Sequence, residues 1–373
     1  MFLVKLKCEN KNRKENRLKT NLAKTKYINR QLLVEKKIIN DLFDYQGFDE
    51  SIKQVYQYYD TVFSTWLKEY ADCFGIENYC FFIKNNNKSN AFALRKKEYN
   101  IIGITNGYPI LMNDKLSSKY FRDIALAGIL NEPDISEAYC ELINNNYFDF
   151  HKFILNCSLR FTFHHEFQHL LQMNFERNNS DEITLNEYLE MSKYDIKKHV
   201  WEFDADRISS HEVLKYVFSV YSKYSLKNEK KFICMLYISV ASVLVTLNLF
   251  YFGIINQIES PYRIDKIPFY TEMYSHPHPL ARCIYIMEYI FECIMNDFPT
   301  LEITAQKMLI NTTGIMKLYF DVIVPENNIM NTFFDEMILH INEINEYNKR
   351  LYNYAIKDYA IKGILLKRNI SFD

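Results

Sequence analysis

One short group of side chains in this chain has the spacing of a metal site. Residues 165–169 read H-E-F-Q-H, so that His165 and His169 are four positions apart with Glu166 between them. On an α-helix this spacing places both imidazoles on one face, one turn apart, where they can bind a single Zn²⁺. A carboxylate beside such a metal can act as a general base. The pattern therefore predicts metal-assisted hydrolysis, with Glu166 as the base.

A second acidic group follows along the chain. Residues 202–206 read E-F-D-A-D. A catalytic zinc takes three protein ligands and keeps its fourth position for water, and Glu202 is the expected third ligand. Asp206 shares a helical face with Glu202, and we expect it to bind the free ring N–H of His165 or His169. The two groups together predict one Zn²⁺ per chain.

Both groups lie in stretches with a helical pattern. Around the first, four apolar residues recur at helical spacing: Phe163, Phe167, Leu170 and Leu171. Such a stripe can face the core while the two imidazoles occupy an adjoining face. Ser158 is the expected N-cap of this helix. The alternative is a pair of ordinary amphipathic helices with solvated charges.

A third group, S-H-P-H-P-L-A-R, spans residues 275–282. Its prolines stiffen the backbone, so that His276 and His278 are presented on a stiff loop. Peptide hydrolysis needs a donor for the oxyanion of the tetrahedral intermediate. We expect His276 or His278 to supply it, with Arg282 orienting that imidazole or contacting the substrate carbonyl. The alternative is a helix-capping loop with exposed histidines.

The composition is that of a cytoplasmic, mostly helical enzyme. The chain has 373 residues, of which 48% are hydrophobic, and only eight Gly and eight Pro. Few Gly and Pro favour long helices over tight turns. A net charge of −1 gives no reason to expect a nucleic-acid partner. The eight cysteines form no C-x-x-C pair, which favours reduced thiols, and the N-terminal residues are too charged for a signal peptide.

An apolar stretch, 232–255, is long enough to span a bilayer. Four polar residues lower its hydrophobicity, namely Ser239, Ser242, Thr246 and Asn248. A single span would also leave the His276 region across the membrane from the zinc. We therefore expect a helix buried in the protein. The alternative is a single-span inner-membrane protein.

The remaining pattern divides the chain into three parts. Residues 1–37 are basic and polar and predict an N-terminal arm or helix. Residues 38–298 hold all three groups, with short strands expected at 79–83, 90–94 and 99–104. Residues 299–373 predict a C-terminal helical extension packed on this domain. The expected fold class is α+β, mostly helical.

Taken together, these motifs resemble those of the gluzincin metallopeptidases. The HtpX and CaaX-prenyl-protease family has H-E-x-x-H, E-x-x-A-D, a later H-P with an arginine six residues beyond its histidine, and an upstream N-A-F-A strand. In this chain, His276 and Arg282 match the later histidine and its arginine, and residues 90–93 match the N-A-F-A strand. The Lit-type phage-exclusion peptidases look similar in size and motif spacing, and they lack a set of membrane helices. The resemblance covers roughly residues 78–290, and we favour the Lit-type branch.

The resemblance implies a zincin-like domain with a small, mainly antiparallel sheet, an active-site helix and flanking helices. It implies zinc ligands at His165, His169 and Glu202, and an endopeptidase that cleaves a cellular protein in phage defence. The substrate would add as a strand to the sheet, at 90–94 (Asn90, Ala91, Phe92, Ala93 and Leu94) or at 99–104. The alternatives are an HtpX-like membrane-associated quality-control protease, an inactive zinc-stabilised interaction protein, and a helical binding protein.

Overall fold

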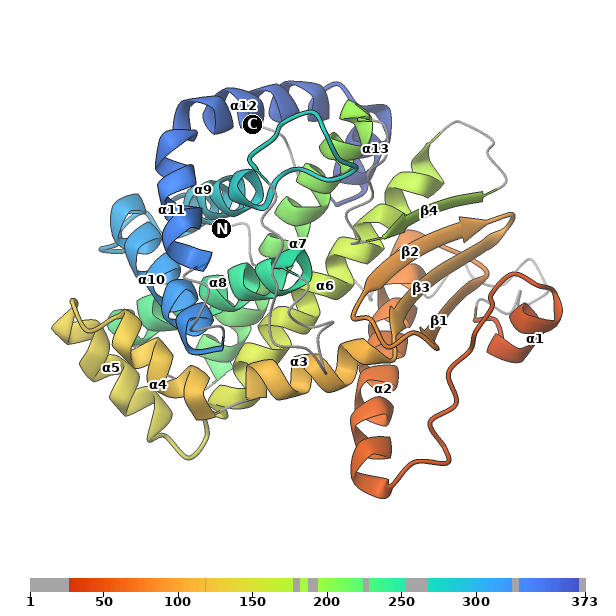
Figure 1. Ribbon diagram of the computed structural model, residues 1–373, viewed down its shortest axis with the longest axis horizontal. Coiled ribbons are helices and arrows are strands. Elements are labelled where there is room, and N and C mark those ends of the chain that lie inside the picture. The colour runs from red at the N-terminus through yellow and green to blue at the C-terminus, as the bar shows by residue number, and fades with distance from the viewer. Residues whose placement is uncertain are drawn as a thin grey trace, which may run out of the picture.

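A computed structural model of the chain describes residues 27–117, 119–176, 182–186, 194–223, 228–252, 268–323 and 329–368. The protein is mostly helical with one small sheet at its side (Figure 1), which confirms the α+β, mostly helical class. Most of the expected N-terminal arm, residues 1–26, lies outside the described part. The rest of that arm includes the short helix α1 (Arg30–Glu35).

The helices and strands have the following bounds. The strands are β1 (Tyr79–Lys84), β2 (Ala91–Lys96), β3 (Tyr99–Thr105) and β4 (Glu182–Asn186). Before the first motif lie α2 (Glu50–Phe74), α3 (Gly107–Ser117), α4 (Lys119–Gly128) and α5 (Pro133–Ile143). The motif helices are α6 (Phe150–Phe175) and α7 (Ile196–Lys223). They are followed by α8 (Glu229–Phe252), α9 (Pro279–Asp297), α10 (Ala305–Ile323), α11 (Ile329–Leu339), α12 (Ile341–Ala355) and α13 (Tyr359–Arg368).

The sheet has the strand order β1-β3-β2-β4. β1 runs parallel to β3, whereas β2 is antiparallel to both of its neighbours. The sheet is therefore mixed. Side chains alternate between its faces, as a period of two requires. Phe81 and Ile102 belong to the main core, while Phe82 and Ile101 face a smaller core that includes Leu33 of α1.

The expected position of the substrate strand is wrong. β3 lies between β1 and β2, and β2 is paired with β4 as well as β3 from Phe92 onward. Neither 92–94 nor 99–104 therefore has an open edge, because the backbone groups on both sides already bind neighbouring strands. Among the described strands, β1 and β4 form the edges of the sheet. The local pattern of a strand predicts its existence but not its place in the sheet.

Helix α6 crosses the middle of the molecule, with its C-terminal end beside the sheet (Figure 1). It begins earlier than the sequence pattern predicts, because Asp149 rather than Ser158 is its N-cap. The Asp149 side chain accepts a hydrogen bond from the backbone N–H of Lys152, which satisfies a free donor of the first turn. Ser158 is instead buried within the helix, where its hydroxyl meets that of Thr246 on α8 at 2.7 Å. At the other end, Arg95 of β2 donates to the carbonyl of Met173.

Helix α8 is the one described helix that is long and apolar enough to cross a membrane, and it is buried among the other helices. Two of its hydroxyls are satisfied within the helix: those of Ser242 and Thr246 donate to the carbonyls of Ile238 and Ser242. For the described residues of this stretch, up to Phe250, the expectation that it is buried is thus confirmed. One such helix is weak evidence for a membrane span and is equally compatible with the core of a soluble protein.

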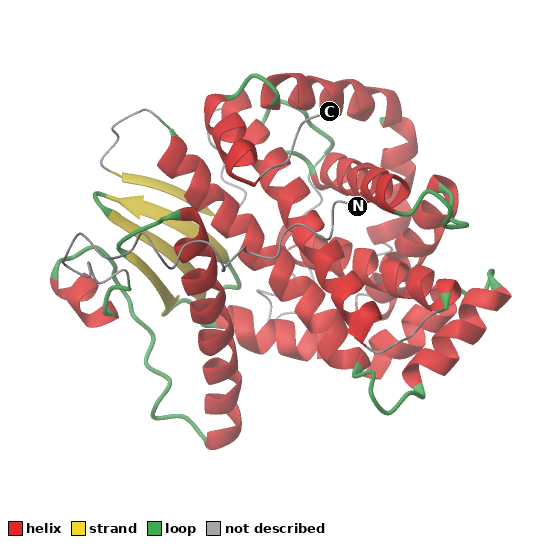
Figure 2. Ribbon diagram, turned by 180° about the vertical axis from the view of Figure 1, so that it is seen from behind, coloured by secondary structure: helices red, strands yellow, loops and turns green. Residues whose placement is uncertain are grey.

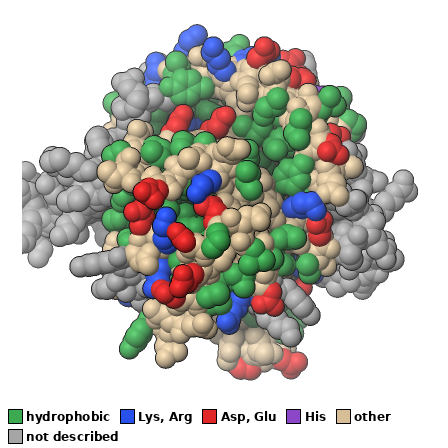
Figure 3. Space-filling view, turned by 90° about the vertical axis from the view of Figure 1, so that its left-hand side faces the viewer, with side chains coloured by type: hydrophobic (Ala, Val, Ile, Leu, Met, Phe, Trp, Pro, Cys, Tyr) green, Lys and Arg blue, Asp and Glu red, His purple; other side chains and the backbone are tan. Residues whose placement is uncertain are grey.

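The C-terminal helices pack on the helices that carry the motifs. α12 lies against α7 and α9, and α13 lies against α6. Figure 2 shows the helical body from the opposite side, with the sheet at its edge. On the surface over α4, α5 and α10, acidic and basic side chains are interspersed with hydrophobic ones (Figure 3). This face therefore carries no large patch of purely positive or purely negative charge.

Candidate metal centre

Two imidazoles and one carboxylate meet between α6 and α7. The Nε2 atoms of His165 and His169 lie 2.9 Å apart, as one-turn spacing on α6 allows. Glu202 of α7 places Oε2 3.2 Å from Nε2 of His165 and Oε1 3.1 Å from Nε2 of His169. All three side chains are buried. The described residues thus form a compact group that could hold a metal ion.

The hydrogen bonds of His169 determine which of its nitrogens carries the proton. Its Nδ1 lies 2.8 Å from Oε1 of Gln172. The amide nitrogen of Gln172 donates to the carbonyl of Trp201 and to Oδ2 of Asp204, so its oxygen faces the imidazole as an acceptor. Nδ1 of His169 therefore carries the hydrogen. The lone pair of Nε2 is left facing the centre.

His165 is held in the same way by a carboxylate. Its Nδ1 lies 3.0 Å from Oδ1 of Asp206. Asp206 also accepts hydrogen bonds from Arg282 and from the hydroxyl of Tyr285. A carboxylate at this distance is placed to accept the Nδ1 hydrogen, which would leave the lone pair of Nε2 facing the centre as well.

The donor atoms fit a bound cation. Two nitrogen lone pairs and an ionised carboxylate converge at 2.9–3.2 Å, and such an arrangement is repulsive unless a positive charge lies among the atoms. Ligand atoms at about 2.0–2.1 Å from a tetrahedral zinc are roughly 3.3 Å apart. Small outward shifts of the three side chains would therefore accommodate the ion.

The charges of the two acids are set by their neighbours. Burial by itself raises the pKa of Glu202, but the imidazoles of His276 and His169 and the hydrogen bond with His165 bring the pKa well below its ordinary value. Burial likewise raises the pKa of Asp206, and Arg282 outweighs this effect, so the net pKa is lowered. Both carboxylates are thus anionic at neutral pH. The centre offers negative charge to a metal.

Glu166 is buried on the same turn of α6 as the two imidazoles. Its place in H-E-x-x-H puts it within one helical turn of both. This is where a base serving a metal-bound substrate would have to lie.

The loop before α9 returns to the centre. Nε2 of His276 lies 3.3 Å from Oε1 of Glu202, and Nδ1 of His276 lies 2.8 Å from the hydroxyl of Ser275. His278 has another position, because its side chain caps α9 by accepting the N–H of Leu280 and packs against Tyr270. Neither imidazole is exposed. The loop therefore brings one of its two histidines to the candidate metal centre.

The structure thus places the candidate residues in two groups. Those gathered at the centre are His165, Glu166, His169, Glu202, Asp206, His276 and Arg282. His278 caps a helix, and residues 90–93 belong to the sheet. Sequence reasoning missed Gln172, Asp204 and Tyr285. Asp204 lay inside a motif and Gln172 one turn after His169, yet their bonds run between two helices and could not be read from either stretch alone.

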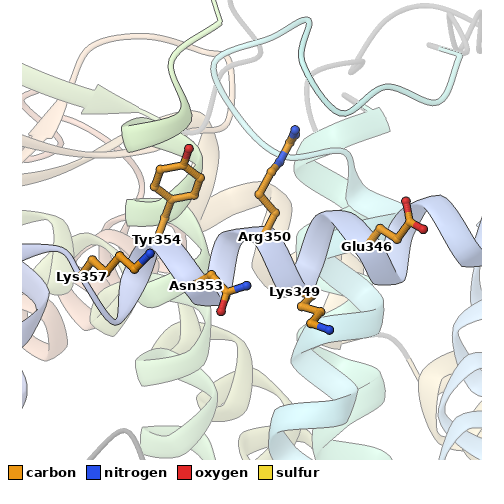
Figure 4. A pocket seen from close by; sticks show the side chains of 6 residues that line it. All are labelled: Glu346, Lys349, Arg350, Asn353, Tyr354 and Lys357. Atoms are coloured by element: carbon orange, nitrogen blue, oxygen red, sulfur yellow. The ribbon is translucent and has the colours of Figure 1, made fainter.

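One cavity lies away from this centre. It has a volume of about 410 Å³ and lies along α12 and the turn that follows. Figure 4 shows its lining, which consists of Glu346, Lys349, Arg350, Asn353, Tyr354 and Lys357. The side chains project from one helix into solvent, and none of them belongs to the candidate metal centre. This cavity carries no argument for function.

No family model, curated protein or solved structure matches the chain. The functional argument therefore depends on the geometry of the described residues and on the chemistry that it permits.

Proposed function

We propose that the protein is a zinc-dependent endopeptidase that acts on a protein substrate. The observation that carries the proposal is the convergence of His165, His169 and Glu202, with Glu166 on the same turn of α6. Two nitrogens and one carboxylate oxygen are a donor set that zinc accepts in catalytic sites. When bound there, zinc would polarise the scissile carbonyl and lower the pKa of a water molecule.

Glu166 is the general base in this proposal. Its carboxylate accepts a proton from the attacking water and later returns it to the nitrogen of the leaving amine. The carboxylate starts and ends the cycle ionised, so that one residue serves both halves of the reaction. Its burial favours proton transfer to the reacting groups over exchange with bulk water.

His276 is the proposed donor to the oxyanion. If the Ser275 hydroxyl donates to Nδ1, the hydrogen of the imidazole lies on Nε2, which faces Glu202. That hydrogen points into the centre, where negative charge develops on the carbonyl oxygen. A preorganised donor of this kind stabilises the transition state more than the ground state.

Arg282 and Asp206 act behind the ligands. Asp206 holds the ring of His165, and Arg282 holds Asp206. Arg282 therefore supports the position of His165 through Asp206. Its Nη2 also lies 3.8 Å from Glu202, which adds positive charge beside the third ligand.

A second candidate function is an inactive, zinc-stabilised interaction protein. The burial of all three ligands and the closeness of His276 to Glu202 favour it, because a fourth protein ligand would close the site as structural zinc sites are closed. The position of Glu166 favours the enzyme, since a structural site has no use for a buried carboxylate at this turn.

The cellular setting is part of the proposal and rests on the resemblance alone. We propose a cytoplasmic peptidase of the Lit type that cleaves a cellular protein during phage exclusion. An HtpX-like quality-control protease at the membrane is the alternative, and α8 is the segment that would serve as its span. A fold or motif does not determine a biological role.

The central experiment compares wild type with Glu166→Gln, by zinc analysis of the purified proteins and by labelling of new protein N-termini in cells. We expect equal zinc, equal thermal stability and loss of all zinc-dependent cleavage products in the variant. Glu176→Gln, at the end of the same helix, is the control and should cleave normally. Equal cleavage by Glu166→Gln would contradict the assigned base, and wild type without zinc would contradict the metal.

A further inference from the structure

The side chain of Gln172 joins His169 to Asp204 across the gap between α6 and α7. We infer that Gln172 is a positioning residue: it holds the ring of His169 in the orientation and tautomer needed for metal binding, and Asp204 holds Gln172. The inference rests on the proposed function only in taking His169 as a metal ligand. It adds two residues that neither motif assigns to the site.

The direction of the Gln172 amide is determined by its partners. Its nitrogen lies 3.0 Å from the carbonyl oxygen of Trp201, which can only accept a hydrogen bond, and 2.8 Å from Oδ2 of Asp204. The oxygen is thereby turned to Nδ1 of His169, at 2.8 Å. A reversed amide would place its NH₂ group against the imidazole and its oxygen against a carboxylate. The network therefore admits one orientation and one tautomer of His169.

Gln168 provides a natural comparison. It lies one turn earlier on the same face of α6, is equally buried, and donates to the same Oδ2 atom of Asp204 at 2.7 Å. Its oxygen, however, accepts from Arg368 of α13 at 3.1 Å and does not face an imidazole. Both glutamines tie α6 to α7 through Asp204. Gln172 alone of the two bonds a candidate ligand.

The two glutamines separate a positioning effect from a packing effect. Methionine is close to glutamine in length and shape but cannot accept a strong hydrogen bond. Gln168→Met and Gln172→Met each remove one hydrogen bond to Asp204 from a buried amide. Any loss that depends on the link between helices should therefore appear in both variants. A loss that depends on the orientation of His169 should appear in Gln172→Met alone.

The first measurement is the Zn²⁺ affinity of the full chain, by competition with a chromophoric chelator. We expect Gln172→Met to weaken Zn²⁺ binding by about 10–100-fold, the usual effect of removing a partner that orients a ligand. Gln168→Met should stay within about threefold of wild type, because every partner of the ligands is retained. Equal weakening in both variants, or none in Gln172→Met, would overturn the inference.

The second measurement needs no metal and no activity. In the metal-free protein labelled with ¹⁵N-histidine, NMR should show His169 with its hydrogen on Nδ1. Gln172→Met should give a mixture of tautomers, and Gln168→Met should match wild type. If His169 kept the same tautomer in Gln172→Met, this result would contradict the inference even if the variant binds zinc. If wild type binds no Zn²⁺, the proposed function fails, and this spectrum still decides the role of Gln172.

Discussion

Arg282 donates two parallel hydrogen bonds to Asp206, from Nε to Oδ2 at 2.8 Å and from Nη2 to Oδ1 at 2.7 Å. Both side chains are buried. A guanidinium and a carboxylate paired in this way form one of the strongest and most directional contacts in proteins. The pair joins α9 to α7, and through Asp206 it reaches His165 on α6. One contact therefore connects three helices at the candidate centre.

Replacing Arg282 should destabilise the fold as well as the metal site. Arg282→Met leaves a buried carboxylate without its cation, which typically costs about 3–5 kcal/mol. Urea denaturation should show this loss. Arg350→Met is the control: it removes a more exposed arginine paired with Glu272 and should cost about 1 kcal/mol or less. Losses of similar size in the two variants would show that the buried pair contributes little.

Metal removal should lower thermal stability reversibly. A ligand that binds only the folded state stabilises it by about 2.7 kcal/mol at a concentration of 100 times its Kd. Dialysis against a chelator should therefore lower Tm, and added Zn²⁺ should restore it. A His165→Ala/His169→Ala double variant should show neither effect. A Zn²⁺ response retained in that variant would place the metal elsewhere.

The two histidines of the 275–282 loop should behave differently. His276→Ala should retain zinc and the fold but lower turnover by about 10²–10³-fold, the scale for one oxyanion donor. His278→Ala removes the cap of α9 and should cost about 1 kcal/mol of stability with little effect on turnover by the folded protein. Zinc analysis, melting curves and turnover distinguish these results. Loss of zinc in His276→Ala would favour the closed, structural site.

Acid should weaken the fold through Glu212. Burial alone raises its pKa, but His164, Lys215 and Arg368 bring the pKa well below its ordinary value near 4.5. Tyr70 also donates to it. A carboxyl with a lowered pKa in the folded state stabilises the protein above its unfolded-state pKa, and this contribution is lost as the pH falls below that value.

The measurement is the free energy of unfolding between about pH 6 and pH 3, by urea denaturation. Wild type should lose stability steeply below about pH 4.5, and Glu212→Gln should show a shallower slope. Glu69→Gln, an exposed glutamate of α2, is the control and should keep the wild-type slope. Parallel curves for wild type and Glu212→Gln would contradict the effect.

Helix α8 should not hold the protein in a membrane. Because the apolar window of α8 is buried by other helices, the protein should be recovered without detergent after lysis. Ultracentrifugation of lysates, with and without carbonate washing, tests this. Recovery in the carbonate-resistant pellet would show that α8 leaves its place in the core and enters lipid.

Much of the fold could be predicted because the relevant patterns are local. The strands at 79–84, 91–96 and 99–105 have apolar β-formers bounded by polar turns, and they form close to where the pattern predicts. The strand order could not be predicted, because it depends on which edges meet after the helices have packed. The start of α6 was misplaced because both Asp149 and Ser158 are good N-caps, and tertiary packing extends the helix to the earlier one.

The candidate metal centre, too, could be predicted only in part from the sequence. Spacing alone is enough to bring His165 and His169 onto one face of a helix. The contacts of Gln172 with Asp204 and of Asp206 with Tyr285 join residues of different helices. Such contacts depend on the rotation of α7 against its neighbours, which no stretch of sequence displays by itself.

His199, at the start of α7, links the His276 loop to the last part of the fold. Its Nε2 lies 2.6 Å from the carbonyl oxygen of Tyr274, and its Nδ1 meets the hydroxyl of Tyr347 on α12. His199 and Tyr347 are 148 residues apart in the sequence, so His199 is synthesised long before Tyr347. A nascent chain therefore carries all three candidate ligands well before Tyr347 can help to hold the loop that brings His276 to Glu202. During synthesis, the three candidate ligands are therefore complete before α12 has emerged and can hold His199 in place.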